Sequence, residues 1–251
     1  MTSFIWNDNR SRPAWQQMAI DRALAARAVG DGAVVFRLYR WSTSSVSFGA
    51  NEQACRTWNR PALDDAGIPC VRRPTGGRGV WHDADDLTYA VTGPAATLGG
   101  LRLAYRVIHE QLAAALAAIG LAATIAPRAH RPTLAPGSCF DLAVGGEVLV
   151  DGRKTIGSAQ ALIGGAILQH GAIARADRGG ALARFRLPSG SVDRSREGRN
   201  LPDHATLARA IVDRWFDEGG CEIPGGLVAW AEEASASHAD QFRDPLWTWR
   251  R

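Results

Sequence analysis

Two predicted β-hairpins dominate the middle of the sequence, and the first of them is turned at adjacent glycines. The first spans residues 140–150 around Gly145-Gly146, and the second joins 154–163 to 165–174. Paired glycines suit two-residue hairpin turns because both turn residues need a positive φ. The middle of the chain is therefore expected to form an antiparallel sheet.

Helical patterns flank and interrupt these strands. The clearest predicted helix spans 101–119, where apolar residues recur at helical spacing before Gly120. His109 and Glu110 lie off that apolar stripe, so we expect both to face solvent. The other predicted elements are helices over 13–29, 61–66 and 205–218, the last capped by Asp203, and strands over 33–41, 45–49, 68–72 and 87–92.

This mixture predicts an α+β fold, a mixed β-sheet with flanking helices. No internal repeat divides the chain, so we expect a single domain over residues 1–251. Its core motifs lie in 33–174, and a C-terminal helix and tail occupy 203–251.

Composition narrows the class of protein. The chain contains no apolar run long enough for a membrane span, and its start lacks a signal-peptide pattern. Four scattered cysteines without metal-ligand spacing favour a reduced cytoplasm. The net charge of +4 suits an acidic protein partner. Late arginines are not interleaved with aromatic residues, so we do not expect nucleic acid to bind.

Lys154 is the only lysine among the 29 Lys and Arg residues of the chain. An ammonium can lose its proton when it is desolvated, whereas a guanidinium stays charged. The small neighbours Gly157, Ser158 and Ala159 would let a ligand approach backbone N–H groups. Lys154 is therefore a candidate functional residue, although a leftover surface charge is the simpler alternative.

A glycine-rich segment, RPTGGRG at residues 73–79, follows the predicted strand 68–72. Closely spaced glycines allow backbone donors to face a ligand oxygen, and the arginines add positive charge. A tight basic turn is an equally good explanation. His82 and His170 lie at strand positions and are candidates for orienting a ligand. Acidic residues at 83–86 suit a solvated turn, so no metal site is predicted.

Cys139 is a candidate nucleophile that opens the first hairpin, fifteen positions before Lys154. A nucleophilic cysteine needs a lowered thiol pKa or a nearby base. A small buried side chain is the usual alternative for a free cysteine. Cys55, Cys70 and Cys221 lack a comparable setting and are predicted to be structural.

Taken in order, RRPTGGRGVWHDADDLTYAV, a long helix, SCFDL, GRKTIGSAQ and GGAILQHGAI resemble the lipoate/octanoate branch of the biotin/lipoate protein ligase family. The resemblance covers about residues 33–174 and includes the early segment WSTSSVSFGANEQ. It implies a mixed sheet with flanking helices and a fatty-acyl tunnel beneath the glycine loop.

Within this family, the chain is most similar to the cysteine-dependent octanoyltransferases. Arg78 stands where ligases typically carry a third glycine, Cys139 matches the transferase nucleophile, and Lys154 matches the family's pocket lysine. The substrate-binding residues that the resemblance implies are Arg73, Thr75, Gly76, Gly77, Arg78, Val80, Trp81, His82, Gly157, Ser158, Ala159, His170 and Gly171. The chain departs from the family pattern at 142–146, 161–163, Gly79 and Ala172.

The implied reaction moves an octanoyl group from acyl carrier protein, through a thioester on Cys139, to a lysine of a lipoyl-carrier domain. Glycine cleavage H protein and 2-oxoacid dehydrogenase E2 are the expected acceptors. No cofactor is expected, and ATP with Mg²⁺ would be needed only by the alternative, a lipoate–protein ligase. Transfer between two lipoyl-carrier proteins and a non-catalytic carrier-binding module are further alternatives. Whether Lys154 acts as a base or as a fixed cation stays open.

Overall fold

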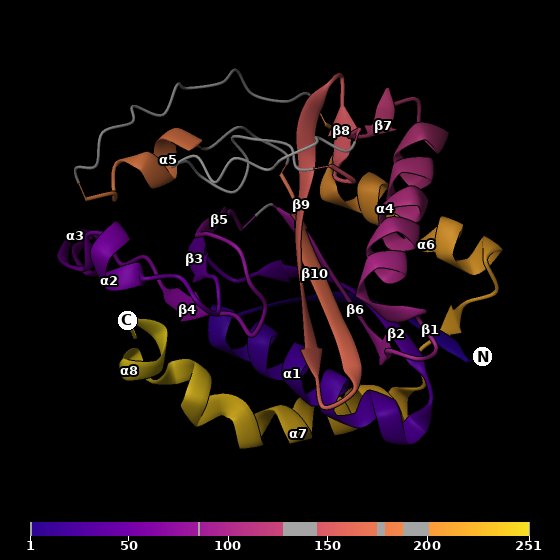
Figure 1. The fold of residues 1–251 in the computed structure, drawn as a ribbon, viewed down its shortest axis with the longest axis horizontal. Helices are drawn as coiled ribbons and strands as arrows, with labels where there is room; N and C mark the ends of the chain where they lie inside the picture. Colours follow the sequence, from indigo (N-terminus) through magenta and orange to yellow (C-terminus); the bar gives the residue numbers. More distant parts are fainter. Residues whose placement is uncertain (1, 85, 128–144, 175–178, 188–200, 251) are drawn as a thin grey trace.

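The computed structural model describes residues 2–84, 86–127, 145–174, 179–187 and 201–250 (Figure 1). An eight-stranded mixed sheet forms its centre, in the order β11-β1-β2-β6-β10-β9-β8-β7. The strand β1 is parallel to β2 and β11, and the remaining neighbours are antiparallel. The strands are β1 (Ser3–Arg12), β2 (Val34–Trp41), β6 (Leu87–Pro94), β7 (Ala123–Ile125), β8 (Val148–Val150), β9 (Arg153–Ile163), β10 (Ala166–Ile173) and β11 (Cys221–Glu222).

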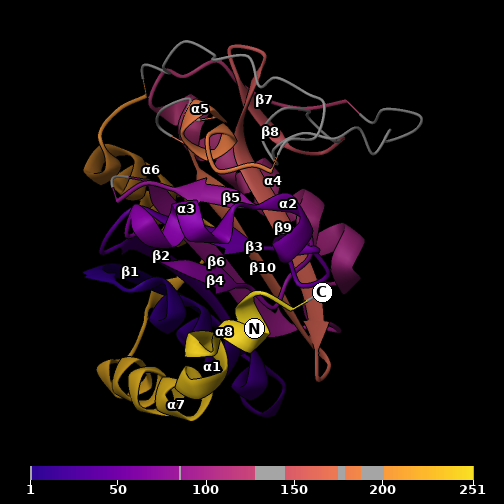
Figure 2. The same cartoon turned by 90° about the vertical axis from the view of Figure 1, so that its left-hand side faces the viewer.

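A small three-stranded sheet lies over one face of the large sheet (Figure 2). It consists of β4 (Cys70–Arg72), β3 (Ser45–Phe48) and β5 (Val80–His82), in the order β4-β3-β5. Val71 of the small sheet packs with Met18 and Tyr39, so the two sheets share a hydrophobic cluster. The space between them is where the pocket lies.

Four long helices cover the large sheet in two pairs (Figure 1). The helices α1 (Ala14–Asp31) and α7 (Gly225–Arg243) pack together on the face that also carries the small sheet. On the other face, α4 (Gly100–Ala118) and α6 (His204–Asp217) cover the largest hydrophobic cluster. The short helices are α2 (Ala54–Thr57), α3 (Arg60–Asp65), α5 (Gly179–Ala183) and α8 (Pro245–Thr248).

The predicted α+β fold with a mixed sheet is confirmed. The second hairpin forms as predicted, and its turn residues Gly164 and Gly165 have φ of 55° and 89°. Asp203 caps α6 by accepting a hydrogen bond from the Thr206 backbone N–H. The first arm of the other hairpin lies outside the described residues, and its predicted second arm, β8, pairs instead with β7 on one side and β9 on the other. Its second arm, β8, turns into β9 at Asp151 and Gly152, which both have positive φ.

Two sequence expectations for α4 are wrong. His109 is fully buried rather than solvent-facing, whereas Glu110 is exposed as expected. Leu101, predicted to lie on the buried stripe, is 41% exposed. The spacing 105–109–112–116 is itself helical and places His109 on the buried face. Its two ring nitrogens are both hydrogen-bonded, and this pairing compensates for their burial.

Several elements escaped prediction, and the longest of them are β1 and α7. The strands β1 and β7 and the helix α7 belong to segments for which no element was expected. Among the described residues, no helix is both long and apolar enough to cross a bilayer.

Candidate active site

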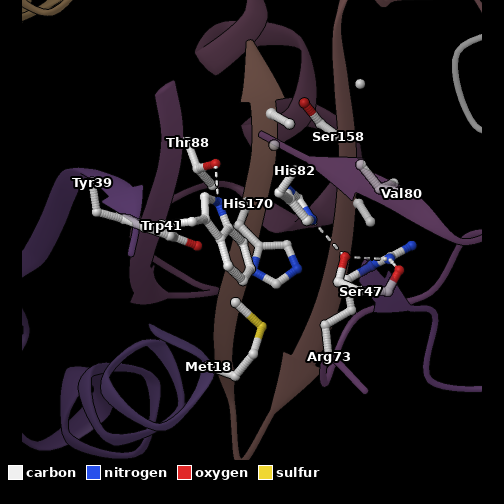
Figure 3. Close-up of a pocket in the computed structure, with 14 residues that line it drawn as sticks. Met18, Tyr39, Trp41, Ser47, Arg73, Val80, His82, Thr88, Ser158 and His170 are labelled. Atoms are coloured by element: carbon white, nitrogen blue, oxygen red, sulfur yellow. Dashed lines mark hydrogen bonds between the residues drawn. The ribbon is translucent and has the colours of Figure 1, made fainter. Parts of the chain in front are cut away.

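A narrow pocket lies between the large sheet and the small sheet (Figure 3). It encloses about 370 Å³, part of it open to solvent, and most of its surface is apolar. Eight predicted binding residues line it: Arg73, Val80, His82, Gly157, Ser158, Ala159, His170 and Gly171. The wall also contains residues that were not predicted to bind a substrate: Met18, Tyr39, Trp41, Ser47, Thr88 and Ala172.

The other predicted binding residues lie near this pocket but do not line it. Thr75 is buried and contacts the pocket residue His170. Gly76, Gly77 and Arg78 form the adjoining glycine loop. Trp81 stacks on Phe185 in a different hydrophobic cluster, with ring centroids 6.2 Å apart.

A β-bulge in β9 turns Lys154 away from the hydrophobic cluster beneath α4. Leu149 pairs with Lys154, but the preceding Val148 pairs with Ile156, so β9 contains one extra residue. Paired residues share a face of the sheet, and consecutive residues alternate between faces. Val148 and Ile156 belong to the cluster beneath α4. Lys154 therefore lies on the opposite face, the one on which Gly157 contributes to the pocket.

Lys154 forms a buried ion pair with Glu147. Lys154 Nζ donates to Glu147 Oε1 at 2.6 Å, and the two side chains are 3% and 5% exposed. Glu147 precedes Val148, so it projects to the same face as Lys154. Burying one of these charges alone would be strongly unfavourable, and pairing compensates for it. Sequence reasoning did not identify Glu147 as a partner of the lysine.

A chain of hydrogen bonds connects α4 to the GSAQ segment of β9. His109 Nδ1 lies 2.6 Å from the carbonyl oxygen of Gly146, which can only accept, so Nδ1 carries the proton. His109 Nε2 is then free to accept from Ser158 Oγ at 2.8 Å. Tyr89 OH lies 2.6 Å from the same Ser158 oxygen, and Gln169 donates to Tyr89 at 2.8 Å. Burial is the main cause that lowers the pKa of His109 to about 4.

A second chain connects the glycine loop to α1. Thr75 Oγ1 lies 2.5 Å from His170 Nε2, and His170 Nδ1 lies 3.3 Å from Asp21 Oδ2. Arg37 and Tyr39 also donate to Asp21, at 2.9 and 3.0 Å. Burial lowers the pKa of His170, so the ring is neutral; Nδ1 donates to Asp21 and Nε2 accepts from Thr75.

The glycine loop is held from within by Arg73. Its guanidinium donates to the carbonyl oxygens of Gly76 and Arg78, both at 2.8 Å, and to that of Ser47 at 2.8 Å. This arginine therefore positions the loop, because its donors are directed to the protein's own backbone. Gly171 is required for a different reason: a Cβ there would lie 2.4 Å from Ser158 Oγ.

The structure describes three of the four cysteines. Cys139 lies outside the described residues, together with the rest of 128–144. Cys55 and Cys221 are exposed. Burial raises the pKa of the Cys70 thiol to about 12, which disfavours its thiolate. In the described part of the chain, no three His, Cys, Asp or Glu side chains are grouped to hold a metal ion.

Comparison with known proteins places this arrangement in a family. Residues 13–203 match the lipoyl protein ligase A/B catalytic domain. The chain is 33% identical to octanoyltransferase LipM of Kyrpidia tusciae, covering 93% of this chain and 94% of that protein. It is 35% identical to octanoyltransferase LipM of Bacillus subtilis, covering 84% of this chain and 78% of that protein.

Solved structures show the same fold at lower sequence identity. Lipoate-protein ligase A bound with ATP superposes with a TM-score of 0.78 at 19% identity, covering 99% of both chains. A bipartite lipoate protein ligase of Thermoplasma acidophilum, solved with its E2 lipoyl domain, gives a TM-score of 0.73 at 20% identity, covering 99% of this chain and 96% of that one. The sequence match and the shared fold agree, and the chain belongs to the lipoyl protein ligase A/B catalytic domain family.

Proposed function

We propose that this chain is an octanoyltransferase that acts in lipoate biosynthesis. The observation that carries this proposal is its similarity, over nearly its whole length, to octanoyltransferases from several bacteria. The narrow apolar pocket supports it, because an octanoyl chain offers only methylene groups along its length. The ligases of known structure share the fold at about 19% identity, which does not indicate a shared reaction.

The proposed chemistry has two acyl transfers. In the first, the Cys139 thiolate attacks the carbonyl carbon of an octanoyl thioester on acyl carrier protein. A bond to Cys139 Sγ forms, the bond to the carrier sulfur breaks, and the carrier leaves as its thiol after taking a proton. In the second, a lysine amine of a lipoyl-carrier domain attacks the enzyme thioester. The amide forms, and the proton released by the amine restores the Cys139 thiol.

We further propose that Lys154 acts as a fixed cation that stabilises the Cys139 thiolate. The buried ion pair with Glu147 supports this role, because the contact at 2.6 Å holds the lysine head group in one position. Backbone N–H groups of Gly76 and Gly77, or of Gly157 and Ser158, are candidate donors to the oxyanion.

The proposed partners are acidic carrier proteins in the cytoplasm, and the basic character of the chain, with a pI of about 9.2, supports this pairing. Glycine cleavage H protein and E2 lipoyl domains are the proposed acceptors. The lipoate protein ligase of T. acidophilum is described together with its E2 lipoyl domain, a protein of the same class. Both steps consume a thioester, so the proposal requires no nucleotide or metal.

The test is an intact-mass measurement after the purified protein is mixed with octanoyl-acyl carrier protein in nucleotide-free buffer. We expect one added octanoyl group on the wild type and none on Cys139→Ala. Cys55→Ala, Cys70→Ala and Cys221→Ala are matched controls that should keep the adduct. An adduct on another cysteine would refute the assignment of Cys139. Activity only with ATP and a free fatty acid would favour the ligase instead.

A further inference from the structure

One nitrogen in the pocket wall lacks a partner. His82, the last residue of β5, is 6% exposed, and its ring stacks on Trp41 with centroids 4.1 Å apart (Figure 3). His82 Nε2 lies 2.7 Å from Ser47 Oγ. His82 Nδ1 has no hydrogen-bond partner within the described ranges. Buried polar atoms are nearly always paired, so an unpaired one in a pocket wall points to a ligand.

The surrounding hydrogen bonds determine what His82 Nδ1 offers. Arg73 Nη1 can only donate, so Ser47 Oγ accepts from it at 3.0 Å. His82 Nε2 is then the acceptor within reach of the Ser47 hydroxyl hydrogen. A proton on Nε2 would leave both that hydrogen and Nδ1 unpaired. A proton on Nδ1 leaves only one group unpaired, so Nδ1 carries the hydrogen and is a donor without a partner among the described residues.

The charge state agrees with this tautomer. Burial, reinforced by the charge of Arg73, holds the pKa of His82 well below its ordinary value. The ring is therefore neutral at physiological pH and carries a single proton. An unpaired N–H in an otherwise apolar wall is unfavourable until a ligand supplies an acceptor.

His82 is linked through neighbouring pocket residues to β9, the strand that carries Lys154. Its stacking partner Trp41 donates to Thr88 Oγ1 at 2.9 Å. Thr88 pairs with Ala172 across β6 and β10, and Ala172 pairs with Gly157 of β9. Gly157 is three positions from Lys154 and lies on the same face of the sheet.

We propose that His82 Nδ1–H donates a hydrogen bond to the carbonyl oxygen of the octanoyl group. This inference rests on the proposed octanoyltransferase function and adds a catalytic residue to it. The carbonyl oxygen is the only strong acceptor that an octanoyl group has. When sulfur or amine attacks the carbonyl carbon, an electron pair moves onto this oxygen and the hydrogen bond strengthens. The pair returns when the leaving bond breaks, and His82 keeps its proton throughout.

Two substitutions separate this role from packing. The amide nitrogen of His82→Asn can replace the Nδ1 donor, whereas the amide oxygen of His82→Gln can replace Nε2 and accept from the Ser47 hydroxyl. We expect His82→Gln to slow first-step acylation by about 10²–10³-fold, the usual effect of losing one oxyanion donor. His82→Asn should stay within about tenfold of the wild type on the same scale. Thermal melts identify any variant that fails to fold.

The carbonyl itself provides the second measurement. An acyl-enzyme made with ¹³C-carbonyl octanoyl donor should show a lower carbonyl stretching frequency in the wild type and His82→Asn than in His82→Gln. Equal frequencies in all three proteins would overturn the proposal. Equal rate losses in both variants would overturn it as well, because packing alone would then explain the effect.

A non-reacting probe tests the donor even if no acyl-enzyme forms. Octanamide carries the same chain and a carbonyl oxygen but no leaving thiol. We expect its binding to shift the Nδ1–H resonance of His82 downfield in a ¹⁵N-histidine-labelled protein. An unchanged resonance at saturating octanamide would refute the inference. Absence of the acyl-enzyme alone would refute the octanoyltransferase function instead.

Discussion

Lys154 illustrates how much of the site depends on one buried contact. Its ammonium lies 2.6 Å from the Glu147 carboxylate, and both side chains are buried. An arginine would keep the charge, but its planar and larger head group demands a different arrangement of acceptors. The retained lysine therefore suits a compact buried space rather than a generic need for positive charge.

We predict that Lys154→Arg slows first-step acylation by about 10²-fold or more, the usual effect of misplacing a positioned group by about 1 Å. The reason is the mismatch between a guanidinium and the Glu147 pocket. The measurement is the acylation rate across pH for the wild type and the variant, with folding checked by thermal melt.

Arg209→Lys is the control, since this side chain is 84% exposed. If Lys154 is a fixed cation, the wild-type rate should rise with pH along a single limb set by the cysteine thiol. A separate limb that follows deprotonation of Lys154 would favour the base role. Near-wild-type acylation by a folded Lys154→Arg protein would contradict any special role for this lysine.

At the scale of elements, α4 and β9 are joined by a polar contact inside an apolar interface. His109 lies between Gly146 and Ser158, and both ring nitrogens are occupied by these two partners. The contact fixes the start of the β8 segment against the GSAQ motif. Protonating His109 would turn Nε2 from an acceptor into a donor and disrupt the bond from Ser158.

We predict that His109 makes folding sensitive to acid. Its pKa is about 4 in the folded protein and about 6.5 when unfolded, so only the unfolded chain takes up a proton between these values. The free energy of unfolding should therefore be unaffected above pH 6.5 and fall as the pH drops toward 4. His109 accounts for roughly 3 kcal/mol of this fall in the free energy of unfolding.

Urea unfolding of the wild type and His109→Gln at several pH values between 7.5 and 4.5 tests this prediction. The glutamine variant should start less stable at neutral pH, and the gap should narrow as the pH falls. The other histidines titrate in both proteins and cancel in the difference. Two parallel curves would show that His109 does not titrate in this range.

The sequence identified most of these elements but not the contacts between them. Two strand-like runs on either side of Gly164 predicted the β9–β10 hairpin, and both Gly164 and Gly165 have the positive φ that such a turn needs. The edge strand β7 has only three residues, too few for a period to be recognised. The bulge in β9 depends on which residue of β8 opposes it, and a pairing register is a tertiary property. The motif residues lining the pocket were indicated by family resemblance, whereas Glu147 and Tyr39 lie outside the motifs and carried no comparable signal.

At the scale of the whole molecule, the end of the chain supports the glycine loop. Arg72 is fully buried and donates to the carbonyl oxygens of Trp247, Thr248 and Arg250 at 3.0–3.1 Å. The same guanidinium donates to the carbonyl oxygen of Gly49 at 2.6 Å. Its neighbour Arg73 holds the glycine loop. Two adjacent arginines therefore anchor the C-terminal segment and the glycine loop.

We predict that deleting residues 245–251 lowers the free energy of unfolding by about 3 kcal/mol or more, because it removes three acceptors from a buried guanidinium. Denaturant unfolding measures this change. Leu246→Ala is the control, since Leu246 is 82% exposed. The same deletion made in an Arg72→Leu background should lower the free energy of unfolding by a clearly smaller amount. Equal costs in both backgrounds would show that the tail acts independently of Arg72.

Because β9 contains one extra residue, the face of the sheet on which a residue lies depends on whether it comes before or after the bulge. Counting back by twos from Ile156 leads to Lys154, and a regular strand would bury that lysine in the core. A one-residue alignment gap placed within residues 148–156 therefore moves Lys154 from the pocket face of the sheet to the core face. In aligning or grafting this segment onto another scaffold, the position of one gap decides whether the transplanted site contains its cation.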